Sequence, residues 1–542
     1  MTVTADDRVA PRGPAAARIA GAATLIAGLT VLSRLAGFAR TLVFSQTVGV
    51  DDLGGVYLAA NTIPNIIFEI VAGGALAGLV VPLLAGPLAA GDRDQVRRTV
   101  SALLTWTLAA LVPLAVLLWF GAGTVMSLLQ PGNSPVLHEA GESMLRVFAP
   151  QLPLYGIGIV LTGVLHAHRR FAWPVLAPLL SSLTVIGAYV LFASRAGKWP
   201  AAETVSVGEL AILSVGTTLG VVVLSLCLVI PVSRLRLGLR PTFSVDPGQR
   251  RRIGGLAAAG MATVVAQQVA LLVTIRLASD TGPATNAVYN LAQTVYLLPW
   301  AVLAVPAATA AYPAIATAHA TADTGTLRLT TARTGRAVLL LSGLGAAGLA
   351  AVAAPAAALL TYTDGDPARS RALATAVIAF TPGLLGYGLS ALHQRTLYAV
   401  GANRLAALGV SGGWAVALVA ALVFSHTLPD GARAAALGAA NSIGMLVMAV
   451  LLAVAVRARV GGPALSGLFR AALAASVAAL AGAVAGIEAG RAVVSGTPGI
   501  MGLAGQGMLS GGVSLVVFLI VCALLDLPDL RPLLDRVRRR RG

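Results

Sequence analysis

Two arginines stand inside the first long apolar stretch of the chain, in the segment Ser33-Arg34-Leu35-Ala36-Gly37-Phe38-Ala39-Arg40. An arginine that faces lipid is costly, so each is expected to face a water-filled cavity or an acidic partner. The guanidinium group is always charged, and its planar fork fits phosphate oxygens. Arg34 and Arg40 are therefore candidates for binding an anionic group. In the alternative interpretation, Arg34 pairs structurally with Glu69, and Arg40 extends to the membrane surface.

Glu69 is the one acidic residue expected deep within an apolar stretch, the second along the chain. It follows Ile63-Pro64-Asn65, and Pro64 is expected to kink the helix because it lacks a backbone N–H. Gly73 and Gly74 come next and would loosen the helix further. This pattern predicts a hinge with one acidic group, as a transporter with two rocking halves would need. An ion pair that joins the first two helices is the alternative.

Signatures of enzymes and metal sites are absent from the sequence. It contains no GxxxxGK[ST], HExxH or CxxC motif. The nearest approach is His166 and His168 beside Arg169 and Arg170, which we interpret as a basic loop at a helix end. The sequence thus predicts no catalytic residue, no metal and no cofactor. Without an ATPase motif, transport would draw on an ion gradient, the membrane potential or a downhill substrate.

Composition identifies the environment of the chain as a membrane. Hydrophobic residues make up 57% of the 542 residues and charged residues 11%, whereas a soluble domain carries about 25% charged residues. The net charge of +17 could indicate nucleic acid, but the basic residues lie in short clusters between apolar runs. This is the pattern of the positive-inside rule, so we expect anionic membrane lipids, and no nucleic acid, as partners. Cys227 and Cys522 lie within apolar runs and are interpreted as small core residues.

The apolar runs predict about fourteen transmembrane helices between residues 19 and 526, since a helical crossing needs about 20 residues. Most of the basic residues fall on one side if both termini are cytoplasmic. Residues 1–18 are then a cytoplasmic tail before an uncleaved first helix, and residues 527–542 form a basic cytoplasmic tail.

A short sequence pattern recurs in the two halves of the chain. Phe148-Ala149-Pro150, with Tyr155-Gly156 after it, matches Phe380-Thr381-Pro382, with Tyr387-Gly388 after it. The repeat predicts two six-helix lobes, residues 19–240 and 241–460. Because six is an even number, the lobes share one orientation and are related by an axis along the membrane normal, which is a transporter architecture. Residues 461–526 would add a further pair of helices.

The segment Ser33-Arg34-x-x-Gly37-Phe38-x-Arg40, taken with Ile63-Pro64-Asn65, Gly74-Ala75 and Val81-Pro82, resembles the N-terminal signature of the MurJ/MviN family of lipid II flippases. The resemblance implies an all-α integral membrane fold of the multidrug/oligosaccharidyl-lipid/polysaccharide exporter superfamily, in the bacterial cytoplasmic membrane. It implies movement of the lipid-linked peptidoglycan precursor from the inner to the outer leaflet by alternating access, without ATP hydrolysis. It also implies that Arg34 and Arg40 hold the diphosphate of the lipid, and that helices in 461–526 form a groove for its tail.

The chain departs from the family pattern at several positions. Thr41 stands where the family has an acid, and Gln293-Thr294 where it often has Asp-Arg; other departures are Gly55, Phe68-Glu69 and Gly73. Arg276 could compensate for the arginine missing from the eighth span. The predicted substrate-binding set is therefore Arg34, Arg40, Arg276 and Glu69, and the predicted hinge and gate set is Gly37, Pro64, Asn65, Gly73 and Gly74. A divergent member of the family would carry a related polyprenyl-diphosphate glycan.

Two other functions stay open at the level of sequence. A cation-coupled multidrug exporter of the same superfamily would present buried acids, for which the chain offers Glu69 alone. A non-transporting scaffold would recruit cell-wall synthesis proteins through the basic tails.

Overall fold

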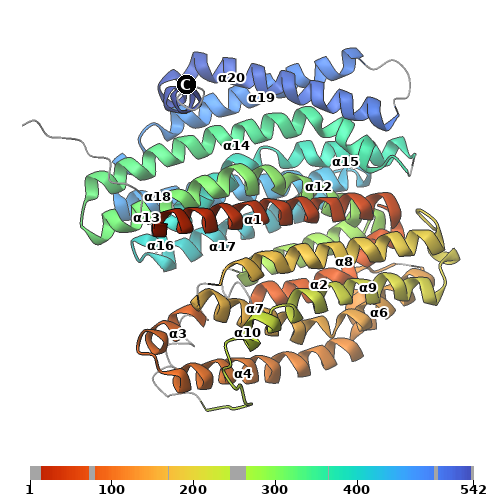
Figure 1. Cartoon of the computed structure of the whole chain (residues 1–542). Helices are drawn as coiled ribbons and strands as arrows, with labels where there is room; N and C mark the ends of the chain where they lie inside the picture. The colour runs from red at the N-terminus through yellow and green to blue at the C-terminus, as the bar shows by residue number, and fades with distance from the viewer. Residues whose placement is uncertain are drawn as a thin grey trace, which may run out of the picture.

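The computed structural model of the chain describes residues 14–71, 80–132, 134–168, 170–244, 264–363, 365–493 and 499–538. Within these ranges the secondary structure is helical, without a β-strand (Figure 1). Gly73 and Gly74 of the predicted hinge lie outside the described residues.

The first half of the chain forms long helices joined by short turns. They are α1 (Pro14–Thr47), α2 (Asp52–Glu69), α3 (Val80–Ala89), α4 (Arg93–Phe120), α5 (Ala122–Leu129), α6 (Pro135–Phe148), α7 (Gln151–Ala167), α8 (Ala172–Ala196), α9 (Val207–Leu226) and α10 (Val229–Ser233).

The second half follows the same plan. It begins with the helix Val264–Ser279 and continues with α12 (Pro283–Pro299), α13 (Val305–Ala320), α14 (Thr324–Leu360), α15 (Pro367–Phe380), α16 (Gly383–Ala399), α17 (Asn403–Thr427), α18 (Arg433–Val460), α19 (Leu468–Val493) and α20 (Ile500–Arg538).

Ordinary capping chemistry sets where many of these helices begin. The side chains of Asp51, Asp92 and Ser134 each accept a hydrogen bond from a backbone N–H in the first turn of the helix that follows. Such caps satisfy backbone donors that have no partner within the helix. Proline at the start of α6 and α12 supplies a backbone angle suited to a first helical turn.

Ten of the described helices or joined helices are long and apolar enough to cross a membrane. The pair α15 and α16, bent by 43° at its break, gives an eleventh. The helices α1, α2 and Val264–Ser279 lie where the sequence predicts three more spans, and Val264–Ser279 is apolar but shorter than the spans counted here. The multi-pass membrane fold is thus confirmed, and the number fourteen stays a prediction.

The repeated sequence pattern falls at the same structural break in both halves. Phe148-Ala149-Pro150 lies where α6 passes into α7, and Phe380-Thr381-Pro382 lies where α15 passes into α16. In each case the proline cannot donate a backbone hydrogen bond, so the span is divided at that point. This correspondence supports the predicted duplication.

The helices pack in two groups that follow the order of the chain. Helices α2 to α9 contact one another, helices α12 to α18 contact one another, and α2 contacts α12 across the groups. Figure 1 shows α1 between the groups and the pair α19 and α20 outermost, where both pack on α14. This arrangement agrees with two lobes and an added pair; the boundaries at residues 240 and 460 stay predictions.

Close approach of helices in the second group depends on glycine. A Cβ on Gly386 of α16 would lie 2.4 Å from the backbone oxygen of Met445 in α18, whereas one on Gly348 of α14 would have no atom within 4 Å. We expect Gly386→Ala to destabilise the protein by about 1–3 kcal/mol because the helices must separate. Gly348→Ala, the matched control, should be neutral or slightly stabilising. Thermal unfolding of the purified protein measures both, and equal unfolding temperatures would contradict this account of the packing.

Candidate functional site

A polar cavity of about 190 Å³ lies where the two groups of helices meet. Its walls come from α1, α2, α8 and α9 of the first half and from α12 of the second. The lining side chains include one arginine, three asparagines, two tyrosines and several threonines; they are Arg40, Thr41, Phe44, Val50, Tyr57, Leu58, Asn61, Thr62, Asn65, Val185, Tyr189, Thr217, Ala287, Asn290, Leu291 and Thr294.

Hydrogen bonds hold the first-half wall of this cavity in place. The Tyr57 hydroxyl lies 2.8 Å from both the Tyr189 hydroxyl and the Thr217 Oγ1. The Tyr155 hydroxyl donates to Asn65 Oδ1 at 2.8 Å, and Asn65 Nδ2 donates to the backbone oxygen of Asn61 at 2.9 Å. Buried networks with satisfied partners make a rigid wall, because each broken bond would leave a costly unpaired group.

Arg40 supplies the positive charge of the cavity. Among the described residues, no carboxylate lines the cavity and no ion pair neutralises Arg40. Its side chain is half-buried in the last third of the apolar helix α1. An arginine in this setting needs an anionic partner or water, so the cavity is suited to an anionic group.

The other predicted binding residues lie elsewhere. Arg34 is exposed on α1, Glu69 is exposed at the end of α2, and neither lines the cavity. The alternative ion pair between them is absent from the described part of the chain. Arg276 pairs with Asp280 beyond its helix end, with its side chain 40% exposed. The structure therefore places Arg40 alone of this set in the cavity, and binding roles for the other three stay predictions.

The predicted hinge residues have mixed positions. Asn65 lines the cavity, and Gly37 has open space around it on α1. Pro64 is buried, and α2 runs through it as one helix, with π-helical geometry at Ile70 and Val71. In the second half, Pro299 likewise precedes a π-helical turn, Trp300–Ala304. Such turns often mark functional deformation in helices, so both lobes carry an irregular turn after a proline.

The sequence analysis missed Tyr57 and Tyr189 because an aromatic residue in an apolar run normally belongs to a core. A usable signal was present in α2. Tyr57, Asn61 and Asn65 are spaced by four residues, which places three polar tips on one face of a helix. Asn290 and Thr294 repeat this spacing on α12 and also line the cavity.

Hydrogen bonds join the two halves near the end of α1, beside the cavity. Gln46 Nε2 donates to the backbone oxygens of Leu359 and Leu360 at 2.7 and 2.9 Å, and the Thr363 hydroxyl donates to Gln46 Oε1 at 2.6 Å. One side chain of the first half thereby satisfies two carbonyls at the end of α14.

The starts of α2 and α12 touch through their backbones. A Cβ on Gly55 would lie 1.9 Å from the backbone oxygen of Pro283, so glycine is required for this approach. Asn286 Nδ2 donates to the Gly55 oxygen at 3.1 Å, and the Ala284 N–H donates to Asp52 Oδ1 at 3.2 Å. These contacts, with those of Gln46, form what we name the seal.

Trp199 adds to the seal from the turn after α8. Its Nε1 donates to the Ser45 oxygen at 2.9 Å, its backbone N–H donates to the Thr47 oxygen at 3.0 Å, and the Arg369 guanidinium lies 5.5 Å from its ring centre. Burial raises the pKa of Asp51 in the neighbouring turn, while a backbone hydrogen bond and the charge of Arg369 oppose this rise. The seal thus joins the halves at the end of the molecule where α1 stops.

Comparison with known proteins identifies the family. The model of the family described as lipid II flippase MurJ matches residues 44–498. The chain belongs to this family. The match begins at Phe44, so Arg34 and Arg40 precede the matched residues.

Relatives and solved structures agree with this assignment. The chain is 26% identical to the lipid II flippase MurJ of Burkholderia cenocepacia over 69% of its length and 72% of that protein. It is 27% identical to a probable lipid II flippase MurJ of Synechocystis sp., over 42% of its length and 43% of that relative.

In fold, the chain matches a structure of lipid II flippase MurJ in an inward closed conformation. The TM-score is 0.74 at 17% identity, covering 94% of the chain and 100% of that structure. An inward-facing MATE family multidrug transporter of the MOP superfamily matches with a TM-score of 0.66 at 18% identity, over 81% of the chain and 98% of that structure. These likenesses confirm the predicted fold.

We expect Gly55→Ala to open the seal, because the added Cβ overlaps a backbone oxygen of the other half. An overlap that costs about 1–3 kcal/mol shifts the closed state about five-fold or more towards opening. The measurement uses Asn61→Cys in a protein whose Cys227 and Cys522 are replaced by serine. Opening of the seal should make this cysteine react faster with a membrane-impermeant maleimide added on the seal side. The matched control is Gly86→Ala, whose Cβ would have no atom within 4 Å. Unchanged labelling in the Gly55 variant would show that this contact does not hold the seal.

Proposed function

We propose that the chain moves lipid II, or a related polyprenyl-diphosphate glycan, from the inner to the outer leaflet of the bacterial cytoplasmic membrane. The observation that carries the proposal is the unneutralised Arg40 in a cavity between two helix groups, in a chain of the lipid II flippase MurJ family. The planar guanidinium fork suits a diphosphate, and Tyr, Asn and Thr side chains suit sugar hydroxyls.

Binding requires a more open state than the one seen here. A cavity of 190 Å³ is too small for a glycan head group, so the halves must separate at the end opposite the seal to admit it. The π-helical turns after Pro64 and Pro299 are suited to this motion. Closing that end and breaking the seal would then expose the head group on the other side of the membrane, while the tail stays in lipid.

We assign both termini to the cytoplasm, which places the seal on the outer side. The membrane potential, negative inside, would then favour return of the empty, positively charged cavity to the cytoplasmic face. ATP hydrolysis is not required. We further propose that the head group contacts Arg34, Arg276 and Glu69 in other conformations of the transport cycle. The basic tails are proposed to contact anionic lipids and cell-wall synthesis proteins.

The added pair of helices supports a groove for the lipid tail in residues 461–526. Exposed apolar side chains recur along one face of α19 at intervals of three or four residues; they are Phe469, Leu473, Val477, Leu480 and Val484. Such a stripe on an outermost helix presents a continuous apolar surface to an isoprenoid chain.

A multidrug exporter for cations is less well supported. Among the described residues, no carboxylate lines the central cavity or the second cavity, of about 130 Å³, within the second half. A cation would meet Arg40 without a counter-charge, whereas an anionic diphosphate would neutralise it.

The test is growth of bacteria depleted of their own lipid II flippase. We expect Arg40→Gln to weaken head-group binding about ten- to hundred-fold, because a charge-assisted phosphate contact contributes about 1.5–3 kcal/mol, and growth should fail. Arg40→Lys keeps the charge but loses the fork, so it should restore growth only in part. Arg404→Gln, at an exposed arginine at the start of α17, is the control and should support growth. Normal growth with Arg40→Gln, at equal protein levels, would refute the proposed role of this residue.

A further inference from the structure

A second, apolar pocket opens on the outside of the first half. It has a volume of about 400 Å³ and lies between α4, α7, α10 and the segment that follows α10. Its walls are almost entirely aliphatic, with Leu104 and Leu108 on one side, Leu161 at the base and Val229 at the rim. Arg236 is the charged residue that lines it.

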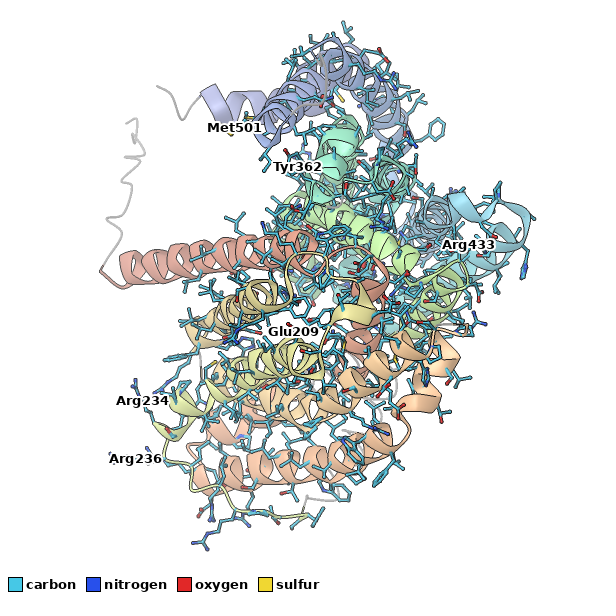
Figure 2. All side chains as sticks on the ribbon, turned by 90° about the vertical axis from the view of Figure 1, so that its right-hand side faces the viewer. Glu209, Arg234, Arg236, Tyr362, Arg433 and Met501 are labelled. Atoms are coloured by element: carbon cyan, nitrogen blue, oxygen red, sulfur yellow. The ribbon has the colours of Figure 1, made fainter. Side chains whose placement is uncertain are left out.

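The segment beside the pocket alternates in character. In Arg234-Leu235-Arg236-Leu237-Gly238-Leu239-Arg240, the leucines pack against the core of the first half, and the three arginines are exposed. Figure 2 shows Arg234 and Arg236 projecting outward from this edge of the molecule. This non-helical segment thus turns an apolar face inward and a basic face outward.

Hydrogen bonds from α4 hold this segment in place. The backbone N–H of Arg240 donates to Ser101 Oγ at 3.1 Å, that of Thr242 donates to Thr105 Oγ1 at 3.0 Å, and Trp106 Nε1 donates to the Phe243 oxygen at 3.3 Å. Polar side chains of a membrane-crossing helix are used here to fix a non-helical segment beside it.

The backbone of Arg236 is held in an unfavourable conformation. Its φ of +50° lies in the left-handed region, which residues with a Cβ rarely adopt. Strain of this kind persists where the surrounding structure imposes it and often marks a functional position. Here it accompanies the placement of an arginine at the mouth of an apolar pocket.

We propose that this pocket binds an anionic glycerophospholipid of the surrounding membrane. One acyl chain would occupy the aliphatic pocket, and the phosphate would meet Arg236, with Arg234 beside it. The chemistry of the pocket points to this ligand. Its aliphatic walls match an acyl chain, and the arginines at its end match an anionic head group. With the orientation proposed above, the lipid belongs to the cytoplasmic leaflet. The inference does not depend on what the central cavity carries.

The experiment uses the full chain purified in detergent and titrated with phosphatidylglycerol or with phosphatidylcholine of identical acyl chains. Native mass spectrometry measures the affinity of the first lipid bound. We expect phosphatidylglycerol to bind more tightly, and Arg236→Gln to weaken it about five-fold, the contribution of one arginine near a charged lipid surface. Val229→Trp, which fills the pocket while keeping every arginine, should weaken it as well. Arg404→Gln, at an exposed arginine of the second half, should leave the affinity unchanged.

Three results would overturn the proposal. Equal affinity for the two lipids would show that the site does not select an anionic head group. Equal weakening by Arg236→Gln and Arg404→Gln would reduce the effect to general surface charge. Retained affinity in Val229→Trp, with an unchanged unfolding temperature, would show that the pocket holds no acyl chain.

Discussion

The proposed mechanism depends on the positive charge of Arg40, which lies between two groups of apolar helices. Arg40 lies in the last third of the apolar helix α1 and faces a cavity that, in the described part of the chain, is lined by no carboxylate. Placing a charge there is costly unless an anion or water accompanies it. The surrounding tyrosine, asparagine and threonine groups can orient a bound group, but they cannot neutralise the charge. The charge therefore requires water or a bound anion beside it.

In the proposed mechanism, the two halves separate first at one end and then at the other, so that Arg40 is exposed to each side of the membrane in turn. At one end, the backbone contact of Gly55 with Pro283 and the bonds of Gln46 join the halves. Buried apolar residues of both halves, such as Val50 and Leu277, pack together beside these contacts. Each half also has a π-helical turn, where a helix can bend while the rest of the span stays helical.

The sequence predicted the class of fold, the repeated Phe-x-Pro pattern and a set of arginines that includes the one in the cavity. It did not predict which arginine faces inward, although helix geometry contains part of the answer. Arg34 and Arg40 are six residues apart and therefore point about 120° apart around a helix, so they cannot share one narrow cavity. Arg276 and Asp280 are four residues apart, the spacing of a local ion pair. The inward roles of Tyr57 and Tyr189 depend on how α2, α8 and α9 are rotated against each other, and this rotation is set by tertiary packing.

The central claim is that the lipid-linked precursor passes through the cavity at Arg40. A photoreactive amino acid placed at Asn61, in cells supplied with radiolabelled precursor, tests this most directly. We predict a crosslink from Asn61 that is lost when Arg40→Gln is added, and little or none from a photoreactive residue at Leu117, which is 68% exposed on the outer face of α4. Equal crosslinking from both positions, unaffected by the arginine change, would contradict the account.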